Sequence, residues 1–156
     1  MAIEAIAEAL ADSWFAVWAA ESSYAYPAAN VVHVFGVVLL VGGIGIVYLR
    51  LLGWFRAIPL HPLARALTPL AVGGLILLVL SGSILFASDA EALARNGTFR
   101  LKLTLIALAL ANAILFRWKV GGLADEPGPG LRLMALLSLL LWTTIAICGR
   151  LIAYSA

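Results

Sequence analysis

The sequence predicts an all-α integral membrane protein, a four-transmembrane-helix up-down bundle preceded by an amphipathic interfacial helix. The 156 residues are 64% hydrophobic and only 12% charged, and their mean hydropathy is +1.08. A typical soluble domain has about 25% charged residues, so a water-soluble monomer is excluded. Apolar windows of about 20 residues are long enough to cross a bilayer as helices, and the chain contains four of them in succession.

Residues 1–25 form the first predicted unit, in which residues 1 to about 20 are an amphipathic helix. Apolar side chains recur every three or four positions, while Glu4, Glu8 and Asp12 form an acidic stripe. An anionic inner leaflet repels such a stripe, so the pattern favours an interfacial position on the outer side. The simplest role for this helix is that of an anchor.

Residues 26–156 form the second predicted unit and contain the spans. The four windows are Tyr26–Leu52, Leu63–Ser88, Thr98–Trp118 and Leu131–Tyr154. The polar breaks between them are Arg56–Pro62, Ser88–Gly97 and Lys119–Gly130. The last break contains a Pro-Gly-Pro-Gly helix stop. Short connections join antiparallel neighbours, so we expect the helices to run alternately up and down.

Basic residues predict the orientation of the bundle. Six lie in or beside the first and third breaks: Arg50, Arg56, Arg65, Arg117, Lys119 and Arg132. The same side holds only Asp125 and Glu126, whereas acidic residues outnumber basic ones on the opposite side. Excess Lys and Arg mark the cytoplasmic side. We therefore expect a multi-pass protein of the bacterial inner membrane with both termini outside. The formal charge of +2 is explained by this topology, so no nucleic-acid partner is expected.

One polar residue or pair in each span falls at a common depth when the chain is counted outward from the inner basic residues. These residues are His33, Ser81 with Ser83, Lys102 and Arg150. At 1.5 Å per residue they lie about 5 Å inside the outer interface. Ionisable groups inside spans are costly and mark candidate functional sites. The alternatives are snorkelling of Lys102 and Arg150 to the headgroups, and a purely structural hydrogen bond for His33.

Gly36 and Gly43 follow His33 on nearly the same helix face and leave a stripe without side-chain bulk. Such a stripe admits either a closely packed helix or a flat macrocycle such as haem, whose iron takes a histidine nitrogen. The other histidine, His61, lies in the inner loop. A haem ligated by two histidines of one chain is therefore geometrically implausible.

Three stretches carry a family resemblance, namely YPAANVVHVFG from Tyr26, YLRLLG from Tyr48 and TFRLKL from Thr98. They resemble an uncharacterised bacterial family of small four-helix membrane proteins. More remotely, they are similar to the copper-resistance D-like superfamily and to the HemJ-type membrane protoporphyrinogen oxidase. In the latter, a histidine early in one span and a lysine that opens a later span are functional, and haem b is bound. The matching residues here are His33 and Lys102.

The resulting hypothesis is a haem b-binding membrane protein with its site near the outer face and His33 as the metal ligand. The predicted cofactor-binding residues are His33, Gly36, Gly43, Ser81, Arg100, Lys102 and Arg150. Arg100, Lys102 or Arg150 would pair with the propionates, and no residue is assigned a catalytic role. A membrane quinol, a porphyrin or an outer-side redox protein would be the partner of such a haem-dependent oxidoreductase.

Two alternatives belong to other classes of protein. The first is a haem-free oligomeric interaction subunit, since glycine faces in several spans also favour a homo-oligomer. The second is a copper or small-solute transport protein. Copper is disfavoured because two distant histidines and one cysteine form no cluster of soft ligands.

Overall fold

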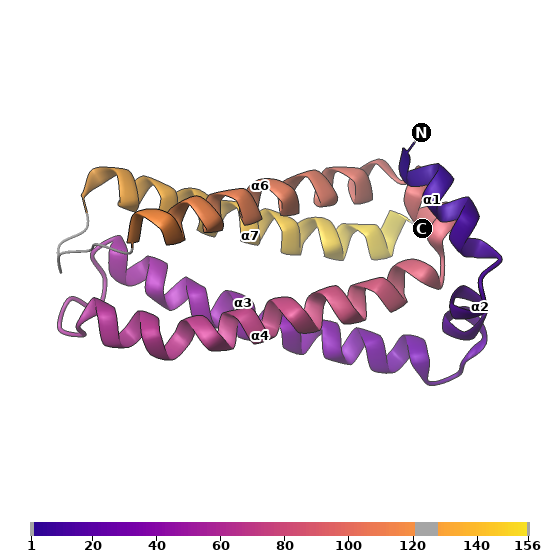
Figure 1. Ribbon diagram of the computed structural model, residues 1–156, viewed down its shortest axis with the longest axis horizontal. Coiled ribbons are helices and arrows are strands. Elements are labelled where there is room, and N and C mark those ends of the chain that lie inside the picture. The colour runs from indigo at the N-terminus through magenta and orange to yellow at the C-terminus, as the bar shows by residue number, and fades with distance from the viewer. Residues whose placement is uncertain (1, 121–127, 156) are drawn as a thin grey trace.

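Four long helices dominate the computed structural model, which describes residues 2–120 and 128–155 (Figure 1). They are α3 (Ala25–Leu51), α4 (Leu60–Ala87), α6 (Gly97–Val120) and α7 (Pro129–Ser155). Each contains a stretch long and apolar enough to cross a membrane. The described residues contain helices and no strand. The predicted class, an all-α multi-pass membrane protein with four spans, is confirmed.

The ends of these helices fall within three residues of the predicted windows. The largest difference is the start of α4, which begins at Leu60 rather than at Leu63. Pro62 therefore lies in the first turn of the helix. A backbone N–H has no intrahelical partner there, so the N–H that proline lacks is not missed by the helix. The predicted third break lies largely outside the described residues, together with Asp125 and Glu126.

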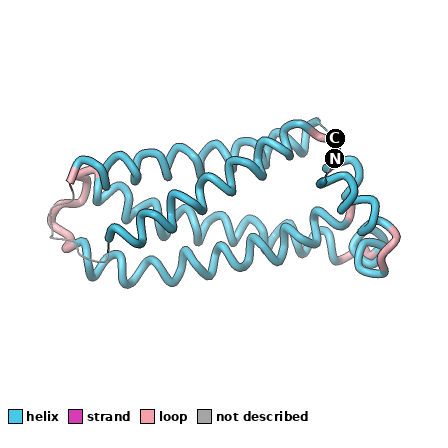
Figure 2. Tube along the Cα trace, turned by 45° about the horizontal axis from the view of Figure 1, so that its top comes forward, coloured by secondary structure: helices cyan, strands magenta, loops and turns pink. Residues whose placement is uncertain are grey.

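The bundle consists of two antiparallel hairpins, α3 with α4 and α6 with α7, which meet mainly through α3 and α7. One cluster of buried residues lies near the connection between α3 and α4: Val47, Tyr48, Leu51, Leu60, Phe116 and Ala135. A second lies further along the bundle: Leu40, Ala71, Ala109, Trp142 and Ile145. Both clusters contain residues of all four long helices. The two ends of the chain lie at the same end of the bundle (Figures 1 and 2), as an up-down order requires.

The N-terminal segment forms two helices instead of the single one expected, α1 (Ala2–Ala11) and α2 (Trp14–Glu21). The Ser13 side chain caps α2 by accepting a hydrogen bond from the backbone N–H of Ala16. Both helices lie across one end of the bundle (Figure 1).

The apolar residues of α1 and α2 pack on protein. Helix α1 packs through Ala7 against α5, a short helix (Ala90–Arg95) within the second break. Helix α2 packs through Ala16 and Ala19 against Ala87, at the end of α4. Part of the apolar surface that was expected to rest in the membrane interface is therefore buried against the bundle.

Candidate site at the polar layer

A hydrogen bond between His33 and Ser81 joins α3 to α4. His33 Nδ1 lies 2.9 Å from Ser81 Oγ, and the Ser81 hydroxyl donates to the Leu77 carbonyl oxygen at 2.6 Å. Since the serine proton is directed at Leu77, the serine oxygen accepts a hydrogen bond from the histidine. In its neutral form the imidazole then carries its proton on Nδ1 and has its lone pair on Nε2. Ser81 is buried, and His33 is half-buried.

Lys102 brings α6 into the same layer. Its ammonium lies near the His33 imidazole on α3 and near Cys148 on α7. The side chain is half-buried, and within the described part of the chain it has no carboxylate partner. The imidazole of α3, the hydroxyl of α4 and the ammonium of α6 thus lie in one layer, and α7 borders it at Gly149.

Two glycines make room for these ionisable side chains. A Cβ added to Gly82 on α4 would lie 3.4 Å from His33 Cε1, and one added to Gly149 on α7 would lie 3.4 Å from Lys102 Nζ. Both distances lie at the short limit of ordinary van der Waals contact. The imidazole and the ammonium therefore lie against the backbone of the neighbouring helix in each hairpin.

The stripe of Gly36 and Gly43 faces α4. A Cβ on Gly36 would lie 2.8 Å from Leu78 Cγ and 3.0 Å from the Gly74 carbonyl oxygen. A Cβ on Gly43 would lie 3.0 Å from the Leu67 carbonyl oxygen. Of the two roles that the sequence allows, the structure shows close helix packing. A macrocycle cannot lie on this stripe, because the backbone of α4 occupies it.

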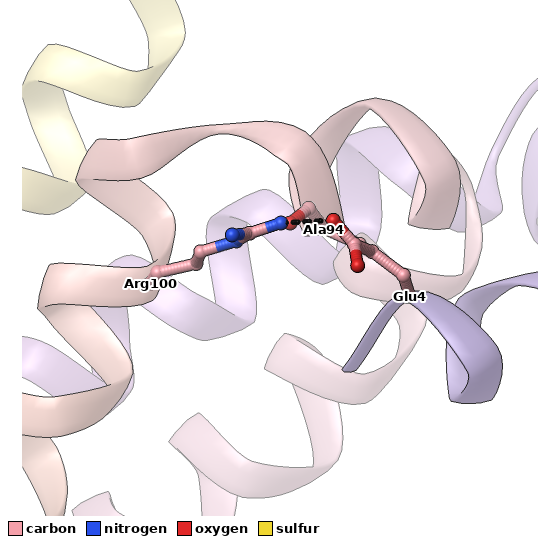
Figure 3. A network of polar contacts seen from close by, with 3 residues as sticks. All are labelled: Glu4, Ala94 and Arg100. Atoms are coloured by element: carbon pink, nitrogen blue, oxygen red, sulfur yellow. Dashed lines mark hydrogen bonds and ion pairs between the residues drawn. The ribbon is translucent and has the colours of Figure 1, made fainter. Parts of the chain in front are cut away.

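Arg100 lies at the end of the bundle that α1 and α2 cover. Its Nε donates to the Ala94 carbonyl oxygen at 2.7 Å, and its Nη2 pairs with the Glu4 carboxylate (Figure 3). The guanidinium therefore fastens α1 to the start of α6 and the end of α5.

Arg150 and Ser83 point away from the layer. The exposed Arg150 donates to the Tyr154 hydroxyl at 2.7 Å, and its guanidinium carbon lies 4.8 Å from the centre of that ring. Ser83 is exposed and donates to the Val79 carbonyl oxygen of its own helix. Of the predicted cations, only Lys102 shares the layer with His33.

Sequence reasoning did not assign Gly82, Gly149 or Cys148 to the site. The sequence does indicate the two glycines, because each is adjacent to a residue of the predicted polar layer, Ser81 or Arg150. Cys148 has no such signal, since a buried cysteine resembles any small apolar residue.

The fold and the layer define a helical multi-pass membrane protein with a polar site shared by four spans. No protein-family model, curated protein or solved structure matches this chain. The described residues contain no group of three or more His, Cys, Asp or Glu side chains suited to hold a metal ion. A haem iron differs from such a centre in its demands, because the porphyrin supplies four ligands and the protein one or two.

Proposed function

We propose that this protein is a haem b-binding redox protein of the bacterial inner membrane, with His33 as an iron ligand near the outer face and both termini outside. The observation that carries the proposal is the hydrogen-bond chain from His33 through Ser81 to Leu77. A histidine that binds a metal usually donates its other ring N–H to a fixed acceptor, which sets the tautomer and the ring orientation. In His33 the acceptor is Ser81, and Nε2 is the atom available to iron.

Lys102 is the second residue suited to bind haem, as a partner for a propionate. A propionate within a membrane needs a cation, and the Lys102 ammonium has no carboxylate partner in the described chain. Arg100 and Arg150 are engaged with Glu4 and Tyr154, so we assign the propionate to Lys102 alone. The ring would have to approach His33 away from Gly36 and Gly43, because α4 covers that stripe.

The protein itself would orient the iron ligand and compensate the charge of a propionate. Ser81 holds the imidazole, Lys102 neutralises a carboxylate, and the helices limit the access of water. Haem, when bound, supplies one-electron chemistry, and the protein tunes it through ligation and burial. The proposed activity is electron transfer from a membrane quinol to an outer acceptor, or the oxidation of a porphyrinogen.

A haem-free interaction subunit is the second candidate function. It is favoured by two glycines that face away from the neighbouring helices, Gly42 on α3 and Gly73 on α4, where an added Cβ would meet nothing within 4 Å. Small residues on outer faces allow helices of another subunit to approach closely.

An absorption spectrum of the full chain, purified in detergent from haem-replete cells, separates the two candidates. We expect a Soret band that is lost in His33→Ala and retained in His61→Ala, the matched control at the opposite end of the bundle. Circular dichroism of both variants checks that the helices persist. Colourless parent protein, or a Soret band unchanged in a folded His33→Ala variant, would refute haem ligation by His33.

A further inference from the structure

A tight basic loop joins α3 to α4 at the end of the bundle opposite α1 and α2. The backbone at Gly53 and Phe55 adopts positive φ angles of 101° and 50°, and a backbone hydrogen bond from Ile58 to Phe55 closes the turn. The loop projects large apolar side chains: Trp54 is 64% exposed, Phe55 52% and Ile58 42%. Aromatic side chains at such a position sit at the level of the lipid headgroups.

Two arginines are held in place by carbonyl groups of this loop. Arg50 Nε donates to the Ile58 carbonyl oxygen at 2.7 Å, and its Nη2 lies 3.4 Å from the Arg56 carbonyl oxygen. Arg56 Nε donates to the Gly53 carbonyl oxygen at 3.0 Å. A guanidinium has five N–H donors, so both groups keep donors for a further acceptor. Less side-chain entropy is lost when such fixed groups bind a ligand.

No described carboxylate lies near these arginines. The described acidic residues lie in α1 and α2, in the turn between them, and around α5, at the other end of the bundle (Figure 1). Further basic residues lie near the same end of the bundle: Arg65 on α4, Arg117 on α6 and Arg132 on α7. The described part of this end is therefore strongly cationic.

We propose that the loop binds the phosphate of an anionic phospholipid in the leaflet that it faces. Arg50 and Arg56 would hold the phosphate through their unused guanidinium donors, which match phosphate geometry. Trp54 and Phe55 lie exposed between them along the chain and would contact the upper part of the acyl chains. An aqueous phosphate would make no use of these apolar side chains, and this favours a lipid. The site is independent of haem.

The test uses native mass spectrometry of the full chain in detergent, titrated with phosphatidylglycerol or with phosphatidylcholine. We expect phosphatidylglycerol to bind more tightly, and Arg56→Gln to weaken it about fivefold, the value for one cation near an anionic lipid surface. Arg50→Gln/Arg56→Gln should weaken it further. Arg95→Gln is the matched control, since Arg95 is exposed at the opposite end and pairs with Glu91. Inorganic phosphate at the same concentration should not displace the lipid.

Four results would overturn the proposal: equal binding of the two lipids, unchanged binding in a folded Arg56→Gln variant, an equal loss in Arg95→Gln, or displacement by inorganic phosphate. The last would indicate a site for a free anion. If Arg56→Gln does not fold, Arg56→Lys and the salt dependence of the parent decide the question. The preference for phosphatidylglycerol must then persist in Arg56→Lys and must fall as salt screens the charges. A preference for phosphatidylglycerol that persisted at high salt would contradict the proposal.

Discussion

Replacement of Gly74 by alanine is expected to force α3 and α4 apart. The added Cβ would lie 2.6 Å from the Leu40 backbone nitrogen and 2.7 Å from the Gly36 carbonyl oxygen. Both are backbone atoms that cannot rotate away, so the helices must separate. Overpacking of this kind costs about 1–3 kcal/mol. The same separation would lengthen the hydrogen bond between His33 and Ser81, because these residues belong to the same two helices.

The matched control is Gly73→Ala, one residue earlier, where an added Cβ meets nothing within 4 Å. Alanine favours the helix over glycine by up to about 1 kcal/mol, so this variant should be as stable as the parent or slightly more stable. The free energy of unfolding is measured by titration of detergent-solubilised protein with dodecyl sulfate, followed by circular dichroism. Equal stability of the two variants would refute the close contact of α3 with α4.

Three other variants give independent tests. Ser81→Ala removes the acceptor of the His33 N–H and should lower the free energy of unfolding by about 1–3 kcal/mol; a stability equal to the parent's would contradict that bond. Lys102→Gln should weaken haem binding by about 1.5–3 kcal/mol in a haem titration if a propionate pairs with the ammonium, whereas an unchanged affinity would refute that pairing. An impermeant thiol reagent applied to intact cells should label a cysteine at Glu8 and miss one at Ala57, and the reverse result would invert the predicted topology.

The spans were predictable because crossing a bilayer demands a length and an apolar composition that the sequence displays directly. Short helices give a weaker signal. Helix α5 has only six residues, too few to show a periodic pattern. The break between α1 and α2 was readable in principle, since Ser13 has the side chain of a typical helix cap. The apolar periodicity continues across that break and favoured a single helix.

The level of His33 and Ser81 along their helices was predictable, since the two side chains meet, whereas the direction of a side chain around its helix was not. A uniform rise of 1.5 Å per residue places His33, Ser81, Lys102 and Arg150 at similar depth. Rotation about the helix axis depends on which neighbour each helix meets, and one chain does not reveal that. Arg150 consequently turns outward, where Tyr154, one turn further along the same helix, accepts its hydrogen bond.

The glycine stripe illustrates the same limit. A face without side chains suits a packed helix and a flat ring equally well, so the residues of α3 alone could not distinguish them. The decisive residue is Gly74 on α4, because it lets the second backbone reach the stripe. Only the register between the two helices brings Gly74 opposite Gly36, and this register is a tertiary property.

Each hairpin places one ionisable side chain beside a glycine of its second helix, His33 beside Gly82 and Lys102 beside Gly149. A lysine near the end of a span ordinarily extends to the headgroups, whereas the space above Gly149 lets this ammonium lie across α7. Because the two hairpins meet mainly through α3 and α7, the separation of imidazole and ammonium depends on how these helices pack. Buried residues at this contact, such as Trp142 of α7 in one cluster with Leu40 of α3, therefore bear on this separation. A core substitution that shifts α7 against α3 would change the distance between the two groups while both hairpins remain intact.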